Sequence, residues 1–185
     1  MRVIAGSAKG RRLAGPRAGV RPVSDRAREG VYSSLGTRVL GAVVLDLYAG
    51  TGAMGIEALS RGAERATFVD RSRGSVRTIA ENLERTGLAE RATVVGRDVR
   101  TFLERETGAP FDLVIVDPPY DVSAEELEPV LRSLAAGALP SEGWTVLLTR
   151  GIRSSTPVIP IDWAAARLLD YGDSLVTLFR PARRP

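Results

Sequence analysis

From residue 43 onward, short apolar segments alternate with segments of helical periodicity, and no other feature of the sequence constrains the fold as strongly. Runs such as VVLDLYA and FDLVIVD have the character of parallel strands that are buried on both faces. The expected strands lie at 43–49, 66–70, 92–95, 111–117 and 144–149. The expected helices lie at 52–61, 72–87, 99–106 and 124–136. This alternation predicts a doubly wound α/β sheet.

Segments at the two ends of the chain extend this prediction. RLLDY and LVTLF, within 167–179, surround a Gly172-Asp173 turn and predict an antiparallel C-terminal hairpin, which brings the sheet to seven strands. RVIAG and RRLAG predict a small N-terminal β-hairpin, and a helix capped by Ser24 or Asp25 should follow it. We therefore expect an N-terminal hairpin and helix at 1–38, packed on a compact domain at 39–185.

The residue types that the sequence lacks exclude several kinds of chemistry. The chain has no cysteine and no histidine, which excludes disulfides, thiolate metal sites and catalysis by a histidine base, and we expect no metal. Its N-terminus has no apolar core of a signal peptide, and no apolar run reaches the roughly 18 to 20 residues that span a bilayer. These features predict a cytoplasmic protein without a membrane segment.

Charge is concentrated at the N-terminus. Residues 1–28 contain eight basic residues and one acid, a net charge of +7 in a chain whose total is +4, so the remainder carries −3. A basic arm on a mildly acidic body is typical of proteins that bind a polyanion such as a nucleic acid. A solubilising extension is the alternative interpretation of the same charge.

GTGAMG, at residues 50–55, matches the glycine pattern that holds a dinucleotide pyrophosphate at the start of a helix. Asp46 precedes it in DLYAGTG, at the end of the first buried strand. A carboxylate there repels a pyrophosphate by about 1 kcal/mol or more and favours a cationic ligand. S-adenosylmethionine carries an ammonium and a sulfonium group and no phosphate, so Asp46 favours this cofactor over a nicotinamide or flavin.

Two further acids follow the next strands. Asp70 ends the second strand, where an acid can accept hydrogen bonds from both ribose hydroxyls of an adenosine-type ligand. Asp98 follows the third strand and is placed to contact the adenine amino group. Together with Asp46, these positions predict that the ligand lies at the carboxyl ends of the strands.

DPPY, from Asp117 to Tyr120, follows the fourth strand directly. Its two prolines fix the backbone and remove two N–H donors, so the carbonyls of this turn can only accept hydrogen bonds. The Asp117 carboxylate and the Pro118 carbonyl could accept both hydrogens of one exocyclic amino group, while Tyr120 stacks on the ring that carries it. This arrangement suits methyl transfer to an aromatic amino nitrogen, which needs positioning more than a strong base.

Six segments of the chain resemble, nearly end to end, the RsmD-type family, which methylates guanine N2 in bacterial 16S ribosomal RNA. They are RVIAGSAKGRRL (2–13), RPVSDRARE (21–29), LDLYAGTGAMGIEALSRGA (45–63), FVD (68–70), DPPY (117–120) and YGDSLVTLF (171–179). The resemblance implies a Rossmann-like class I methyltransferase fold and a monomeric cytoplasmic enzyme that acts on rRNA within the small ribosomal subunit. The target base must leave its stack to enter such a site.

The resemblance also implies roles for individual residues. Catalysis falls to Asp117, Pro118 and Tyr120. The expected S-adenosylmethionine contacts are Asp46, Tyr48, Gly50, Gly52, Asp70, Asp98 and Asp25. The expected RNA contacts are Lys9, Arg11, Arg12 and Arg21. The 21–29 segment should lie against the cofactor pocket, with Arg21, Ser24, Asp25 and Arg28 as lining candidates.

Three positions depart from the family pattern, namely Val23, Gly30 and Arg97. Gly30 lies inside an expected helix, where it costs roughly 1 kcal/mol relative to alanine. Methylation of DNA adenine N6 or of a protein glutamine, a nicotinamide oxidoreductase, and a non-catalytic RNA-binding assembly factor are the competing interpretations. Asp46 disfavours the oxidoreductase, and the short chain leaves no room for the target-recognition region of a DNA enzyme.

Overall fold

The computed structural model describes residues 1–15, 24–105 and 110–182. Its strands are β1 (Val43–Leu47), β2 (Arg65–Asp70), β3 (Ala92–Gly96), β4 (Leu113–Val116), β5 (Thr145–Gly151), β6 (Trp163–Asp170) and β7 (Ser174–Pro181). Its α-helices are α1 (Asp25–Leu35), α2 (Ala53–Ser60), α3 (Arg73–Thr86), α4 (Val99–Arg105) and α5 (Ala124–Ser133). Short turns of other helix types lie at η1 (Gly36–Val39), η2 (Ala89–Arg91) and η3 (Leu134–Ala138).

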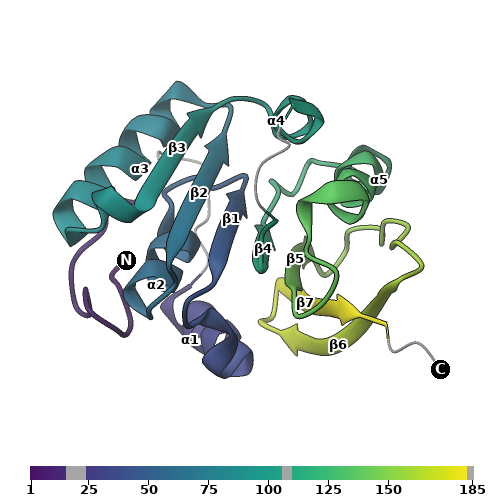
Figure 1. Ribbon diagram of the computed structural model, residues 1–185, viewed down its shortest axis with the longest axis horizontal. Coiled ribbons are helices and arrows are strands. Elements are labelled where there is room, and N and C mark those ends of the chain that lie inside the picture. The colour runs from purple at the N-terminus through teal and green to yellow at the C-terminus, as the bar shows by residue number, and fades with distance from the viewer. Residues whose placement is uncertain (16–23, 106–109, 183–185) are drawn as a thin grey trace.

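The strands form one sheet in the order β3-β2-β1-β4-β5-β7-β6 (Figure 1). β1 to β5 are parallel, while β7 runs antiparallel to both β5 and β6. This confirms the predicted seven-stranded α/β sheet with its antiparallel C-terminal hairpin. The order in which the strands are added reverses between β1 and β4, since β2 and β3 lie on one side of β1 and β4 and β5 on the other. Ligands of open α/β sheets bind beside this switch point.

Both faces of the sheet are covered, because alternate residues of each strand point to opposite sides. Val44 of β1 belongs to the apolar core that also contains residues of α1, α2 and α3. Leu45 and Leu47 belong to the core on the other face, with residues of α4 and α5. The alternation places Asp46 on the same face as Val44, where it lies next to α2.

The N-terminal hairpin is present but small. Its two sides meet in a single antiparallel bridge between Arg2 and Arg12, and the tip rests on the end of α2, where the Ser7 N–H donates to the Ser60 carbonyl at 2.8 Å. The side chain of Ser24 caps α1 as expected, accepting a hydrogen bond from the Ala27 N–H. The hairpin and helix therefore lie on the body of the protein.

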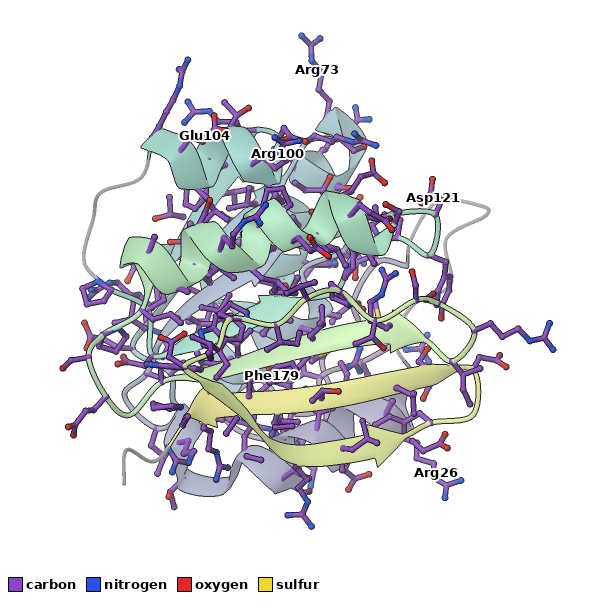
Figure 2. All side chains as sticks on the ribbon, turned by 90° about the vertical axis from the view of Figure 1, so that its right-hand side faces the viewer. Arg26, Arg73, Arg100, Glu104, Asp121 and Phe179 are labelled. Atoms are coloured by element: carbon purple, nitrogen blue, oxygen red, sulfur yellow. The ribbon has the colours of Figure 1, made fainter. Side chains whose placement is uncertain are left out.

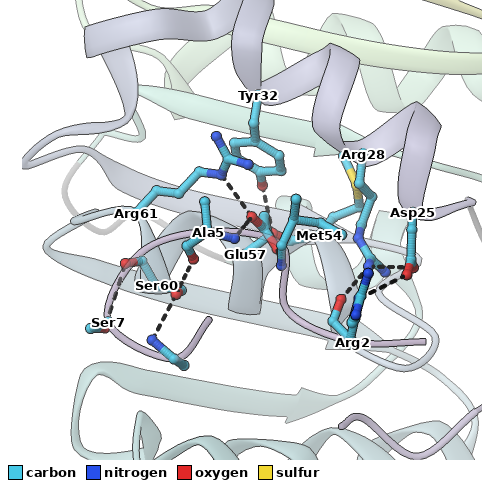
Figure 3. Close-up of polar contacts among 12 residues, drawn as sticks. Arg2, Ala5, Ser7, Asp25, Arg28, Tyr32, Met54, Glu57, Ser60 and Arg61 are labelled. Atoms are coloured by element: carbon cyan, nitrogen blue, oxygen red, sulfur yellow. Dashed lines mark hydrogen bonds and ion pairs between the residues drawn. The ribbon is translucent and has the colours of Figure 1, made fainter. Parts of the chain in front are cut away.

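Buried polar contacts fasten the hairpin to α1 and α2 (Figure 3). The fully buried Glu57 carboxylate accepts hydrogen bonds from the N–H groups of Ile4 and Ala5, and it pairs with Arg61 at 2.7 Å. On α1, the fully buried Arg28 donates to the Arg2 carbonyl. These contacts fix the start of the chain to two different helices.

Some element boundaries differ from the prediction. β1 ends at Leu47 instead of residue 49, because Tyr48 has a positive φ of 59°. β6 starts at Trp163, four residues earlier than expected, and its irregular pairing between Ala165 and Arg167 interrupts the pattern on which the prediction rested. The helix expected over 124–136 changes from α to π at Leu134.

Candidate active site

One large cavity opens at the carboxyl ends of the parallel strands. Its volume is about 930 Å³, and its lining runs from Ser24 before α1 to Val176 in β7. Ligand pockets commonly measure about 300–1,000 Å³, so this cavity has the volume for a nucleoside-sized cofactor together with a base. Among the described residues, no cluster of acidic side chains has the arrangement of a metal site.

The loop between β1 and α2 forms one wall of this cavity. Gly50 and Gly52 have φ angles of 58° and 74°, in the left-handed region that glycine adopts without strain. Gly55 faces the next strand so closely that a Cβ atom would overlap the Phe68 ring. The three glycines thus turn the loop sharply and allow α2 to pack closely on β2.

Asp46 lies beneath this loop and is 1% exposed. Its Oδ2 accepts a hydrogen bond of 2.8 Å from the Gly55 N–H. Burial raises the pKa of Asp46 well above its usual value, the Gly55 N–H opposes that rise, and the charges of Asp117 and Asp70 add to it. A cationic ligand would stabilise the ionised form of this carboxylate, so the site fits a group with the ammonium and sulfonium charges of S-adenosylmethionine.

The carboxylates that follow β2 and β3 also line the cavity. Asp70 accepts a hydrogen bond at each oxygen, from Gly50 N–H through Oδ2 and from Ser72 N–H through Oδ1, both at 2.8 Å. Asp98 accepts from the Arg100 N–H at 3.0 Å and so caps the start of α4. Both carboxylates are therefore held in fixed orientations along the wall.

The DPPY turn follows β4 and lies on the opposite side of the switch point. Asp117, Pro118, Pro119 and Tyr120 all line the cavity. Desolvation raises the pKa of Asp117 to about 6, although a hydrogen bond from the Thr149 side chain opposes the shift. Asp117 is thus mostly ionised at neutral pH and can still take up a proton.

Tyr120 lies over the last pair of residues in the β5–β7 ladder. Gly151 of β5 and Ser174 of β7 are partners there. The Tyr120 hydroxyl lies 2.9 Å from Ser174 Oγ, and a Cβ atom at position 151 would come within 3.0 Å of Tyr120 Cδ1. The ring is nevertheless 56% exposed, so it is held in place while much of its surface stays available for stacking.

The structure brings most of the expected site residues together. Eight of them line the one cavity, and they are Asp46, Tyr48, Gly50, Asp70, Asp98, Asp117, Pro118 and Tyr120. Gly52 lies just behind the lining, at the N-cap of α2.

Two residues of the 21–29 segment, Asp25 and Arg28, are not part of the cavity lining. Asp25 is not a lining residue, since its carboxylate pairs with Arg28 at 2.8 Å. Arg28 is fully buried and is likewise absent from the lining. Ser24 does line the cavity, as expected, and Ala27 lies beside it. Arg21 and Val23 lie outside the described residues.

Sequence reasoning missed the wall that β5 and β7 contribute. Thr149, Arg150 and Gly151 end β5, and Tyr171 and Ser174 border the turn before β7. The end of β5 could have been found by the rule that already located Asp46 and Asp117, since the carboxyl ends of parallel strands share one edge of the sheet. The contribution of β7 could not, because an antiparallel strand brings its first residue to that edge.

Comparisons with known proteins identify the family of the chain. The family model described as conserved hypothetical protein 95 matches residues 1–180. Ribosomal RNA small subunit methyltransferase D of Escherichia coli K12 is 33% identical over 168 residues, which cover 90% of this chain and 83% of that protein.

Solved structures of methyltransferases superpose on this chain over most of its length. The Escherichia coli protein yhhF superposes with a TM-score of 0.86 at 33% identity, covering 98% of this chain and 97% of its own. SMU.776, solved in complex with SAH, superposes with a TM-score of 0.73 over 88% of this chain and 50% of its own. Its identity of 17% carries the likeness no further than the fold. The fold is that of S-adenosylmethionine-dependent methyltransferases.

Proposed function

The chain belongs to the family of conserved hypothetical protein 95, and we propose that it transfers a methyl group from S-adenosylmethionine to the exocyclic N2 amino group of a guanine in small-subunit ribosomal RNA. The observation that carries this proposal is the position of Asp117 and Tyr120 in the same cavity as Asp46 and Asp70. The cavity thereby contains a binding site for a cationic nucleoside, at Asp46 and Asp70, and a binding site for a planar base with an amino group, at Asp117 and Tyr120. The Escherichia coli relative, a ribosomal RNA small subunit methyltransferase by name, supports ribosomal RNA as the substrate class.

Asp46, Asp70 and the glycine loop would hold the cofactor, with Tyr48 and Asp98 at the same wall. The bound cofactor would supply an electrophilic methyl group. Asp46 would face its positive charges, because the carboxylate is buried beneath the loop. Asp70 would accept hydrogen bonds from ribose hydroxyls, since an oxygen that already accepts one backbone N–H keeps a free lone pair.

The DPPY turn would hold the target amino group. The Asp117 carboxylate and the Pro118 carbonyl would each accept one N2 hydrogen, directing the nitrogen lone pair toward the methyl group. Tyr120 would stack on the guanine ring after the base has left its own stack. The new C–N bond would form as the bond between the methyl carbon and the sulfonium sulfur breaks, which leaves a neutral thioether. N2 must then lose a proton, and a carboxylate whose pKa is about 6 can accept it and pass it to water.

The partner in this proposal is 16S rRNA within the small ribosomal subunit, and the protein acts in the cytoplasm as a monomer. Lys9, Arg11 and Arg12 are exposed on the N-terminal hairpin. There they would contact phosphates of RNA that lies away from the target nucleotide. Among the described residues, no helix has the length and apolar character needed to cross a membrane.

The deciding experiment uses small subunits from a strain that lacks its own copy of this enzyme. They are incubated with the protein and methyl-labelled S-adenosylmethionine, beside naked 16S rRNA and duplex DNA, and the labelled nucleoside is identified after digestion. Label in N2-methylguanosine, chiefly from the subunits, is expected. Label in methyladenine from DNA would overturn the guanine assignment and keep the cofactor. Cofactor binding without any label would favour the non-catalytic assembly factor.

A further inference from the structure

The interior of the cavity is strongly acidic. Of the seven carboxylates in its lining, Asp46, Asp70 and Asp117 are the ones that are not exposed, and the exposed arginines of the lining, Arg71 and Arg100, lie at the mouth. Such an interior attracts a cationic cofactor and admits a neutral base, but it repels phosphate groups. The phosphates on either side of the target nucleotide must therefore be held outside the cavity, at its rim.

No described residue of the N-terminal hairpin lines the cavity. The tip of the hairpin is bound to Ser60, at the C-terminal end of α2, whereas the cavity lies at the N-terminal end of that helix, beside Gly50. The eight residues of α2 separate the two ends by about 12 Å. The hairpin is therefore placed to contact RNA beyond the cavity, whereas Arg71 and Arg100 border the cavity itself.

Four exposed arginines lie on the other side of the loop. Arg71 follows β2, Arg73 begins α3, Arg97 follows β3, and Arg100 lies in the first turn of α4. Arg71 and Arg100 line the mouth of the cavity, and their charges oppose the rise in the pKa of Tyr48 that burial causes. Figure 2 shows Arg73 and Arg100 on the same upper side of the molecule, with Arg73 extending away from the body.

These arginines have no structural partner. Within the part of the chain that the structure describes, none of their four guanidinium groups forms an ion pair or a hydrogen bond, whereas Arg65 and Arg85 each pair with a glutamate. Their positions also disfavour the helices, because positive charge near a helix start opposes the helix dipole. α5 shows the favourable arrangement, with Glu125 and Glu126 in its first turn. The cluster therefore has no role in stability that would explain it.

We propose that Arg71, Arg73, Arg97 and Arg100 form a phosphate-binding rim that holds the RNA backbone next to the target nucleotide. The proposal rests on the proposed function for its substrate. The acidic interior and the basic rim then act together, because the rim binds the backbone and the interior admits only the base. Arg97, which departs from the family pattern, gains a role as one of these contacts.

The test compares two double variants that each remove two exposed arginines. Arg73→Gln/Arg97→Gln removes rim charges that do not line the cavity, so the cofactor site stays intact. Arg65→Gln/Arg85→Gln is the matched control. The dissociation constant for a labelled 16S rRNA fragment is measured by fluorescence anisotropy at several salt concentrations. S-adenosylmethionine affinity is measured by calorimetry, and the melting temperature of each variant verifies folding.

The rim variant is expected to bind RNA about tenfold or more weakly at low salt, with the slope of log Kd against log salt reduced by about 1 to 2, since each phosphate contact contributes about 0.7 to 0.9. Its cofactor affinity should equal that of the wild type, and the control should keep the wild-type slope. An unchanged slope in the rim variant, or an equal reduction in the control, would overturn the proposal. A changed slope in a protein that makes no N2-methylguanosine would support the rim and refute the proposed function.

Discussion

At Asp117 the stability of the fold and the chemistry of the site oppose each other. Desolvation raises the pKa of this carboxyl from 3.8 to about 6, so the folded protein holds a proton that the unfolded chain releases. The stabilisation that belongs to the protonated form is complete below about pH 4 and is lost as the pH rises through about 6. At neutral pH the ionised group costs the fold up to about 3 kcal/mol.

Asp117→Asn should therefore stabilise the protein and inactivate it. The amide is neutral at every pH, so the variant should melt several degrees above the wild type at pH 8 and at the same temperature at pH 4. Methyl transfer should be lost, while calorimetry should give an unchanged S-adenosylmethionine affinity. In the wild type, kcat/KM should fall below about pH 6. A variant that melts lower than the wild type at pH 8 would refute the origin that we give for the shift.

Gly30 lowers the helix propensity of α1, and its contact with Tyr171 explains why a glycine stands there. A Cβ atom at this position would overlap the hydroxyl oxygen of Tyr171, a cavity residue in the C-terminal hairpin. Glycine thus allows the helix to approach the hairpin, and this close approach offsets the loss of roughly 1 kcal/mol of helix propensity.

Gly30→Ala should lower the melting temperature, because the new methyl group must displace Tyr171. The same substitution in a Tyr171→Phe background should do less harm, since the overlapping oxygen is gone and the helix gains an alanine. Thermal unfolding of the four proteins in this cycle measures the coupling. If the two substitutions are additive, the contact between position 30 and Tyr171 does not explain the glycine.

At the scale of elements, the parallel part of the sheet was predictable and its exceptions were not. Buried parallel strands such as β1 and β4 are continuous apolar runs, which stand out in any sequence. The left-handed Tyr48 depends on the fold around it, because only surrounding contacts hold a non-glycine residue there. The early start of β6 was hidden by the exposure of that strand, whose residues carry little apolar pattern.

The same distinction applies to the site. Asp46, Asp70 and Asp117 could be placed because each follows a strand that the sequence reveals. Asp25 and Arg28 could not, since their directions depend on how α1 is rotated against the body. Arg28 turns inward to the Arg2 carbonyl and takes the Asp25 carboxylate as its partner. Local patterns do not fix such a rotation, because it arises from packing between distant segments.

The end of the β5–β7 ladder should control how Tyr120 is presented. Ser174→Ala removes the partner of the Tyr120 hydroxyl, so the exposed ring gains rotamer freedom. We expect a several-fold rise in KM for RNA with little change in cofactor affinity, and Tyr120→Phe should have the same effect. The double variant should have no higher KM for RNA than either single variant. Ser174→Thr keeps a hydroxyl at this position and should have the KM of the wild type. Ser133→Ala, on α5, is the control. Additive losses would show that the hydroxyl pair does not orient the ring.

At the scale of the whole molecule, the N-terminal hairpin is integrated into the core through Glu57. This buried carboxylate joins Ile4 and Ala5 of the hairpin to Arg61, which lies over the Tyr32 ring at 5.1 Å. Tyr32 donates in turn to the Met54 carbonyl, and Met54 lines the cavity. The start of the chain is thereby connected to the active site through buried contacts, and we propose that residues 1–38 and the rest unfold as one unit.

Glu57→Gln tests this unit. The amide can accept hydrogen bonds from fewer of the three groups that donate to Glu57, which are the N–H groups of Ile4 and Ala5 and the Arg61 guanidinium. A buried N–H without an acceptor costs about 1–3 kcal/mol. The melting temperature should therefore fall by several degrees, in a single transition. Glu64→Gln, at an exposed pair with Arg65, should change the free energy of unfolding by less than about 1 kcal/mol. Two separate transitions in the Glu57 variant would show that the hairpin is an independent unit.

The lining of the cavity, which extends from Ser24 to Val176, has a consequence for protein synthesis. The strand β7 follows β6 along the chain, yet it inserts between β5 and β6 and completes the wall that holds Tyr120. A chain that is still being translated, or one that terminates early, lacks this wall even when its first five strands have formed. Such a chain keeps the residues that we propose to hold the cofactor but lacks the wall that holds Tyr120, so we expect it not to methylate RNA.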